Sequence, residues 1–200
     1  MWLMLHLRGF AQACPEITLN LSAAHAPSDF ALGQADIDIC YGVPHWPDLV
    51  KEPLFEEHIV PLASPAFICE HGLKKPEQLL ELPLIQSNVS VVQWSDWFAA
   101  YTSQRAPDHF AVRFDRAQMS LDAATQGLGV ALESATIAGG HIASRQLKPV
   151  FGLDKAIKVK AHFAVYPLAM PSGLRWKLFW LGCMARPLSA PRPPPGSRRR

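Results

Sequence analysis

The sequence predicts an α/β fold in which strands and helices alternate along the chain and form largely parallel sheets. Three observations favour this class. The chain has 200 residues, of which 49% are hydrophobic and 18% charged, enough apolar surface to form a buried core. Short segments of alternating apolar and polar residues, typical of strands, are separated by segments with helical apolar spacing. The length allows one large domain or two small lobes.

The predicted elements follow one another from the first residues onward. Helical spacing of apolar positions predicts a first helix over residues 2–13, which Pro15 ends. Alternation or short apolar runs predict strands over 17–21, 36–41, 49–63 with an interruption at Pro53, 84–86, 110–114, 129–132, 147–151 and 159–166. Further helices are expected over 29–35, after Ser64-Pro65, and over 94–101, 115–126, 134–144 and 174–184.

Three helix starts carry capping signals. Serine is a preferred N-cap and proline a preferred first helical residue, which fits Ser64-Pro65. Residues 90–93 and 115–118 each fit a capping box. Each of these helices follows a strand, and such helix starts gather at the carboxyl edge of an open α/β sheet. They either only cap their helices or help to form a cleft whose free amides suit an anion.

Two further sequence patterns can be interpreted either structurally or functionally. Gly127-Leu128-Gly129 lies between a helix and a strand, so Gly127 is interpreted as a helix C-cap rather than as part of a phosphate loop. Asp36 and Asp38 share one face of a strand. They are either a carboxylate pair for acid–base or metal chemistry, or a solvated strand edge.

The charge is concentrated at one end of the chain. The formal net charge is +2, from 19 Lys and Arg against 17 Asp and Glu. Residues 186–200 contain five arginines and no acidic residue, so the rest has 14 basic and 17 acidic residues, a net charge of −3. The small excess of basic over acidic residues therefore does not indicate a nucleic-acid partner. The proline- and arginine-rich segment 186–200 is expected to be disordered.

The sequence lacks the motifs that are typical of several classes of functional site. Four cysteines form no CxxC pair and eight histidines form no HxxxH or HExxH pattern, so neither a metal nor a disulfide framework is expected. No nucleophile motif or phosphate-binding loop occurs, so we expect no catalytic residue and no cofactor. The apolar start is too short to span a membrane and lacks the layout of a signal peptide. A cytoplasmic protein without a membrane partner is therefore expected.

A series of short motifs links the chain to a known family. In chain order they are Leu7-Arg8-Gly9-Phe10 with Pro15-Glu16-Ile17, residues 36–39 with Tyr41-Gly42, and residues 61–65, 83–85, 94–97, 113–115 and 121–132. Their order and spacing over roughly residues 3–166 resemble the effector-binding domain of LysR-type transcriptional regulators. The Tyr-Gly, Trp-x-x-Trp and Phe-Asp elements are most similar to the subgroup of the glycine-cleavage activator and AmpR.

The resemblance implies a periplasmic-binding-protein-like (type II) fold with two Rossmann-like lobes and a ligand cleft between them. Lobe I would comprise residues 1–62 and 167–185, and lobe II residues 63–166. A small polar or anionic effector would bind in the cleft and shift lobe closure, which a homodimer or homotetramer would transmit. DNA would be bound only through a winged helix-turn-helix domain, which we expect to be absent from this chain.

The resemblance also implies which residues line the cleft. They follow strands or begin helices, where hydroxyls, amides and carboxylates can orient a small polar effector. They are Tyr41, Gly42, Ser64, Gln86, Ser87, Asn88, Phe114, Asp115, Glu133, Ser134 and His162. Each could instead make only a cap or a loop contact. Two other functions stay open, a solute-binding protein of the same fold and a small α/β enzyme.

Overall fold

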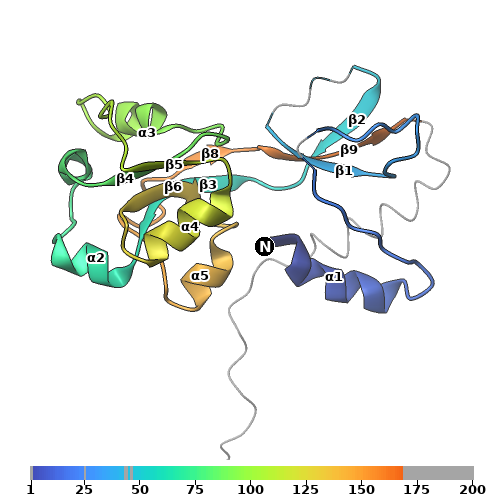
Figure 1. Ribbon diagram of the computed structural model, residues 1–200, viewed down its shortest axis with the longest axis horizontal. Coiled ribbons are helices and arrows are strands. Elements are labelled where there is room, and N and C mark those ends of the chain that lie inside the picture. Colours follow the sequence, from blue (N-terminus) through green and yellow to red (C-terminus); the bar gives the residue numbers. More distant parts are fainter. Residues whose placement is uncertain (1, 25, 43–44, 46, 169–200) are drawn as a thin grey trace, which may run out of the picture. The chain divides into compact units, whose positions relative to one another are not determined.

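A computed structural model describes residues 2–24, 26–42, 45 and 47–168. The described chain divides into a small unit, residues 3–23, and a large unit that contains residue 2 and residues 24–168 (Figure 1). The expected helix over 174–184 and the segment 186–200 lie outside the described residues.

Helix α1 (Trp2–Ala13), which the apolar spacing predicts, lies in the small unit except for its first residue. The helix ends just before Pro15, where the amide of Cys14 still donates to the carbonyl of Phe10 at 2.9 Å. The strand expected over 17–21 is wrong, because this segment is extended but belongs to no sheet among the described residues. Alternation favours an extended backbone, whereas a strand also needs a partner to satisfy its amides.

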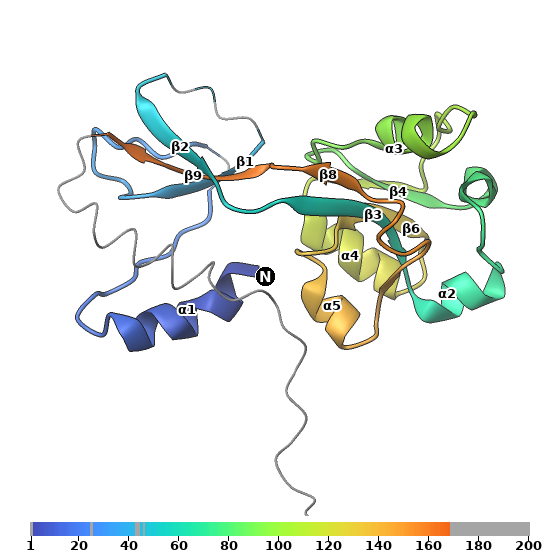
Figure 2. The ribbon, with the colours of Figure 1, turned by 180° about the vertical axis from the view of Figure 1, so that it is seen from behind.

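Sheet A of the large unit is a three-stranded antiparallel sheet. It consists of β1 (Asp38–Tyr41), β9 (His162–Pro167) and β2 (Leu49–Pro53), in that order. Tyr41 lies opposite His162, and Pro53 lies opposite Phe163. Proline is tolerated at this place because β2 is an edge strand (Figure 2).

Sheet B contains the other strands in the order β5-β4-β6-β3-β7, with β8 also paired to β3. They are β3 (Glu57–Ala63), β4 (Leu84–Ser87), β5 (Val112–Phe114), β6 (Val130–Ser134), β7 (Lys148–Pro149) and β8 (Ile157–Val159). Only the pairs of β4 with β5 and with β6 are parallel. The prediction of largely parallel sheets is therefore wrong. Helical crossovers enforce parallel pairing, but β3 enters sheet B directly from sheet A through residues 54–56.

Strand pairing also differs from the expected division of the chain. Residues 57–62, expected in lobe I, belong to sheet B, where 57–59 pair with β8 and 59–62 with β6. Residues 162–166, expected in lobe II, pair within sheet A. The chain changes sheets at residues 54–56 and 160–161, while the division into two lobes stays a prediction.

Helices follow most of the strands of sheet B. They are α2 (Pro65–Glu70), the 3₁₀ helix η1 (Pro76–Glu81), α3 (Trp94–Tyr101), α4 (Ala117–Thr125) and α5 (Gly139–Ala143). Two predicted helices are wrong in extent. Residues 29–35 form only turns, and the helix expected over 134–144 is confined to five residues. The predicted start at Ser134 is wrong because this residue ends β6, and residues 135–138 form turns before α5 begins at Gly139.

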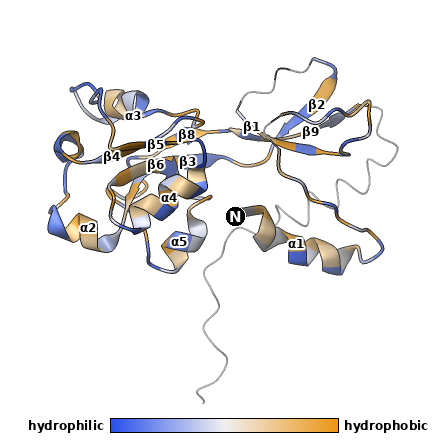
Figure 3. Cartoon of the chain, in the orientation of Figure 1, coloured by the Kyte–Doolittle hydropathy of each residue, from blue (hydrophilic) through white to orange (hydrophobic). Residues whose placement is uncertain are grey.

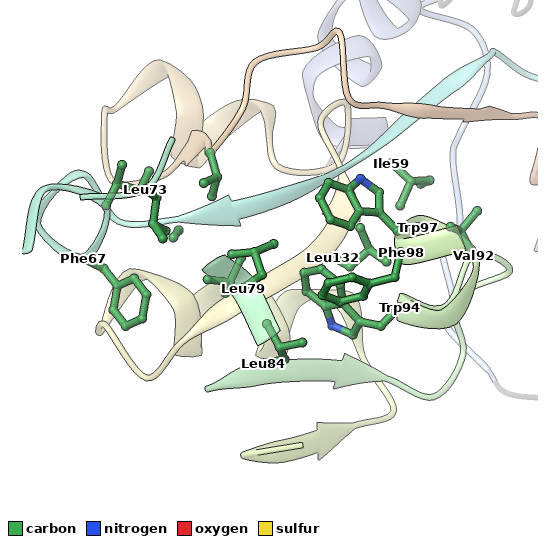
Figure 4. Close-up of a cluster of buried hydrophobic side chains, with 14 residues drawn as sticks. Ile59, Phe67, Leu73, Leu79, Leu84, Val92, Trp94, Trp97, Phe98 and Leu132 are labelled. Carbon is green, nitrogen blue, oxygen red and sulfur yellow. The ribbon is translucent and has the colours of Figure 1, made fainter. Parts of the chain in front are cut away.

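Each face of sheet B buries an apolar cluster. One cluster contains Trp94, Trp97 and Phe98 of α3 (Figure 4), and the other packs Leu121 of α4 against Ile85 of β4. The indole N–H groups are also satisfied, since Trp94 donates to the carbonyl of Ile85 at 2.9 Å and Trp97 to that of Lys155 at 2.8 Å. Strands β4 and β6 begin with the apolar residues Leu84-Ile85 and Val130-Ala131-Leu132 and end with polar ones. Figure 3 shows the hydropathy of these elements along the chain. The two tryptophans thus belong to the core that fixes the strand ends.

Candidate functional site

Polar side chains gather at one edge of sheet B. The parallel strands β4 and β6 end there at Ser87 and Ser134, and Glu133 precedes the last of these. Because β3 runs antiparallel to β6, its first residue, Glu57, comes to the same edge. The carboxyl edge of parallel strands is the usual place for a ligand in open α/β sheets.

Glu57 is a fully buried carboxylate with one hydrogen bond. Its Oε1 atom lies 2.8 Å from Nδ1 of His162, and Oε2 has no hydrogen-bond partner in the described structure. The His162 ring also contacts Tyr41, at 4.8 Å between centroids, and stacks on Phe55 at 5.4 Å.

Glu133 is the second buried carboxylate, with only 5% of its surface exposed. Burial raises its pKa to about 7; the hydroxyls of Ser120 and Ser87 act to lower it, and the charge of Glu57 raises it further. The Oε1 atom of Glu133 and the hydroxyl of the buried Ser87 have no hydrogen-bond partner of normal geometry among the described residues. Unpaired buried polar atoms of this kind are uncommon in folded proteins.

Tyr41 joins this group from sheet A. Its hydroxyl accepts a hydrogen bond of 3.2 Å from the amide of Val91, in the loop that follows β4. Burial raises the pKa of Tyr41, hydrogen bonds to Val91 and Ser90 lower it, and the charges of Glu57 and Glu133 raise it. The phenol therefore lies within electrostatic range of both carboxylates. We refer to Tyr41, Glu57, Ser87, Glu133 and His162 together as the polar edge.

The structure brings four predicted residues into the polar edge and adds one that the sequence did not indicate. Tyr41, Ser87, Glu133 and His162 were predicted, whereas Glu57 was not. A signal for Glu57 exists, since an acidic residue begins the strand Glu57–Ala63, whose residues 59–63 are apolar. Its importance depends on the direction of β3, which local sequence does not define.

Ser64 does not lie with the polar edge. It follows β3 seven residues after Glu57, so the two ends of this extended segment are roughly 20 Å apart. Its hydroxyl accepts a hydrogen bond of 3.2 Å from the amide of Phe67 and caps α2. The expected helix cap is confirmed, but the structure does not bring Ser64 to the other candidate residues.

The remaining predicted residues surround the strand ends in different ways. Gln86 is buried, and alternation along β4 directs it to the face opposite Ser87. Its amide donates to the carbonyl of Ser87 at 2.9 Å and contacts Gln93. Gln86 and Gln93 line an open hollow of about 660 Å³ beside α3, together with Arg113. Gln86 shares its face of sheet B with Glu57, two residues before Ile59, whereas Ser87 and Glu133 belong to the other face, so the polar edge includes side chains from both faces.

The other predicted residues shape turns. Asn88 and Asp115 are exposed, and the Asn88 amide donates to the carbonyl of Phe114 at 2.9 Å, which joins the ends of β4 and β5. The hydroxyl of Ser134 lies 3.4 Å from the amide of Ile137 in the turn that follows β6. Gly42 has a φ of 103°, a conformation that favours glycine, and its amide donates to the carbonyl of Ala161 at 2.8 Å.

Two of the expected capping boxes are wrong. Helix α3 has Gln93 as its N-cap rather than Ser90, and the Asp96 carboxylate accepts from the Gln93 amide at 2.7 Å. Helix α4 has Arg116 at this position rather than Asp115, and no side-chain cap. An anion at the start of α3 would therefore meet the carboxylate of Asp96, which weakens the expectation of an anion site there.

The polar edge can bind a small molecule through hydrogen bonds and charge. Glu57 and Glu133 supply acceptors, Ser87 supplies a hydroxyl, and the rings of Tyr41 and His162 supply flat surfaces. No group of three or more His, Cys, Asp or Glu residues in the described chain is placed to hold a metal ion. The described helices also include none with the length and apolar character needed to cross a membrane.

Comparison with known proteins gives consistent matches. The model of the LysR substrate binding domain matches residues 1–180. The HTH-type transcriptional regulator PerR of Escherichia coli K12 is 40% identical over 167 residues, which are 83% of this chain and 55% of PerR. The glycine cleavage system transcriptional activator of the same strain is 32% identical over 169 residues, or 82% of this chain and 53% of the activator. The chain thus spans about half the length of these curated relatives.

Solved structures agree in fold. The effector domain of the transcriptional regulator AmpR of Pseudomonas aeruginosa superposes with a TM-score of 0.74 and 26% identity, covering 92% of this chain and 89% of that domain. The AmpR effector binding domain from Citrobacter freundii gives a TM-score of 0.76 at 23% identity, with 92% and 91% coverage.

Proposed function

The chain belongs to the LysR substrate-binding domain family, and from this membership we propose that it senses a small polar molecule at the polar edge. As an effector-binding domain of the LysR type, it has mixed α/β sheets that fit a periplasmic-binding-protein-like type II fold. The relatives are transcriptional regulators, so the proposed role is regulatory rather than catalytic.

The observation that supports this proposal is a set of buried polar atoms that make no hydrogen bond of normal geometry with the described residues. Three such atoms, Glu57 Oε2, Ser87 Oγ and Glu133 Oε1, belong to the polar edge. Each unsatisfied buried polar group costs about 1–3 kcal/mol, and more when it is charged. A ligand that hydrogen-bonds to these atoms would recover part of that free energy. Without a ligand, the protein therefore already presents buried polar atoms with which a polar ligand can form hydrogen bonds.

The polar edge also provides a route for a signal. Tyr41 and His162 belong to sheet A, whereas Glu57, Ser87 and Glu133 belong to sheet B. A ligand that contacts both groups would favour one arrangement of the two sheets over others. In the whole regulator, a cytoplasmic homodimer or homotetramer would transmit this change to a winged helix-turn-helix domain that binds DNA.

A thermal-unfolding screen of the full chain tests the proposal. Organic acids, amino acids and small amines are added singly, and each incubated sample is also analysed for chemical conversion. A ligand at one hundred times its dissociation constant should stabilise the fold by about 2.7 kcal/mol. We expect stabilisation without conversion. Conversion would indicate an enzyme, and no stabilisation by any compound would contradict the proposal.

A variant pair localises the binding. Ser87→Ala removes a hydroxyl of the polar edge, whereas Ser103→Ala removes an exposed hydroxyl in the loop after α3. Stabilisation by a compound should fall in the first variant and persist in the second. A compound that stabilises both equally would bind elsewhere.

A further inference from the structure

The hollow beside α3 has the features of a second binding site, separate from the polar edge. We propose that this hollow, of about 660 Å³, binds a small organic acid whose single carboxylate is held by Arg105 and Arg113. Its volume lies within the range of sites for small molecules in proteins. No residue of the polar edge lines it, so this proposal does not depend on the sensing function proposed above.

Strand register brings the polar side chains of the hollow together. Gln86 of β4 lies opposite Arg113 of β5 in a parallel pair, so both side chains point to the same face of sheet B. Neighbouring strands lie about 4.8 Å apart. Gln93, which precedes α3, contacts the amide of Gln86. These three side chains therefore form a continuous polar part of the lining.

The loop between α3 and β5 carries Arg105 and supplies most of the remaining lining. It is fixed at both ends. The Thr102 hydroxyl donates to the carbonyl of Phe98 at 3.0 Å, and the Ala111 amide donates to the carbonyl of Leu84 at 2.9 Å. A ligand that binds to a fixed loop loses less free energy to ordering than one that binds to a mobile loop.

The charges of the hollow favour an anion. Its lining contains two arginines, Arg105 and Arg113, and one aspartate, Asp108, which give a net charge of +1. Within the described part of the chain, none of these three side chains forms an ion pair. One carboxylate would neutralise the excess positive charge. A phosphate group, with a charge of about −1.5 to −2, would exceed it and would be repelled more strongly by Asp108.

The guanidinium of Arg113 is placed for contact with a carboxylate. Its Cζ atom lies 4.8 Å from the centroid of the Phe110 ring, and both residues line the hollow. A guanidinium stacked on a ring keeps the N–H donors in its plane available, and a carboxylate can accept two parallel hydrogen bonds from such a group. Phe110, Ala99 and Pro107 provide apolar surface for the carbon atoms of the acid.

Matched probes test the charge of this ligand. Amide NMR titrations of the full chain, at constant ionic strength, compare lactate with lactamide and glycolate with glycolamide. Within each pair the probes have nearly the same shape and differ by the negative charge. Inorganic phosphate serves as the alternative anion and ethanolamine as a cation. Shifts of the backbone amides of residues 102–113 report binding in the hollow.

Four variants accompany the probes. Arg113→Gln removes one positive charge from the hollow, and Asp108→Asn removes the negative one. Arg8→Gln makes the charge change of the first variant in α1, outside the hollow, and Ser87→Ala alters the polar edge instead. The three charged positions are exposed, so their variants should unfold in urea like the unaltered protein.

Lactate and glycolate should bind in the hollow, and their amides should bind at least about tenfold more weakly. Arg113→Gln should weaken the binding of both acids about threefold or more, and Asp108→Asn should strengthen it. Arg8→Gln and Ser87→Ala should leave it unchanged.

The inference is wrong if neither acid binds, if acids and amides bind alike, if phosphate binds more tightly than the acids, or if Arg113→Gln has no effect. Binding that Ser87→Ala abolishes and Arg113→Gln preserves would assign the acid to the polar edge. That result would overturn this inference and support the proposed sensing function.

Discussion

At Glu133 the effect of burying a carboxylate can be measured as a pH dependence of stability. Burial raises its pKa from 4.5 to about 7, with Ser120, Ser87 and Glu57 as the neighbours that modify it. Between these pH values the folded protein holds a proton that the unfolded chain releases. The free energy of unfolding should therefore fall as pH rises from about 4.5 to about 7, by roughly 3 kcal/mol, and then level off.

Urea unfolding of the unaltered protein and of Glu133→Gln at pH 5, 6, 7 and 8 measures this contribution. The variant lacks the titrating group, so its stability relative to the unaltered protein should increase over this range. Most of the increase should occur below pH 7. Parallel stability profiles for the two proteins would show that Glu133 has an ordinary pKa. Glu81→Gln makes the same charge change at an exposed position in η1, so it serves as the control and should show no such divergence.

Gly129 permits the closest backbone contact that a glycine makes in the described chain. A Cβ atom at this position would lie 2.2 Å from the carbonyl oxygen of Pro83, which also accepts the amide of Val130 at 2.9 Å. We expect Gly129→Ala to lower the free energy of unfolding by roughly 3 kcal/mol, because the contact joins the starts of β4 and β6.

Gly140→Ala is the matched control for this substitution. Gly140 lies in α5, has no atom within 4 Å of an added Cβ and has no positive φ. Alanine there should be neutral or should stabilise the fold by up to about 1 kcal/mol. Equal losses in both variants, measured by urea unfolding, would show that the close approach to Pro83 is unimportant.

At the scale of single elements, a substitution at the start of α2 can show whether Ser64 caps the helix or binds a ligand. Ser64 caps this helix through its hydrogen bond with the Phe67 amide, at the end of β3 away from Glu57. Ser64→Ala should therefore reduce the free energy of unfolding by about 1 kcal/mol. Ser103→Ala, in an exposed loop, should leave it within about 0.5 kcal/mol. Neither variant should alter the stabilisation by a compound that binds at the polar edge. Loss of binding in Ser64→Ala would place this residue in the site after all.

Elements with strong local signals could be predicted from the sequence, whereas their pairing could not. Apolar spacing indicated α1, and Ser64-Pro65 indicated the start of α2. Gly127 also has the positive φ of a helix C-cap, at 76°. The direction of β3 depends on a three-residue connection between two sheets, which no residue pattern records. Glu57 was missed for this reason, since only antiparallel pairing with β6 brings it to the polar edge.

At the scale of the whole molecule, the proposed mechanism depends on a link between ligand binding and assembly. LysR-type regulators bind small molecules and oligomerise, and the dimer or tetramer proposed for this chain follows from that membership. If the effector changes the arrangement of sheets A and B, it should also change the shape of the assembly. A ligand with equal affinity for both arrangements would shift nothing.

Sedimentation velocity of the full chain tests this link. We expect a species of at least about 44 kDa, twice the 22.1 kDa of one chain, at micromolar concentration. A saturating compound that stabilises the fold should change the sedimentation coefficient if it changes the arrangement of the two sheets and with it the shape of the assembly. Ser87→Ala should keep the assembly but reduce this response at the same compound concentration, since the substitution removes a hydroxyl of the polar edge. A monomer at high concentration would contradict the assembly. A compound that binds without changing the coefficient of the unaltered protein would separate recognition at the polar edge from signal transmission.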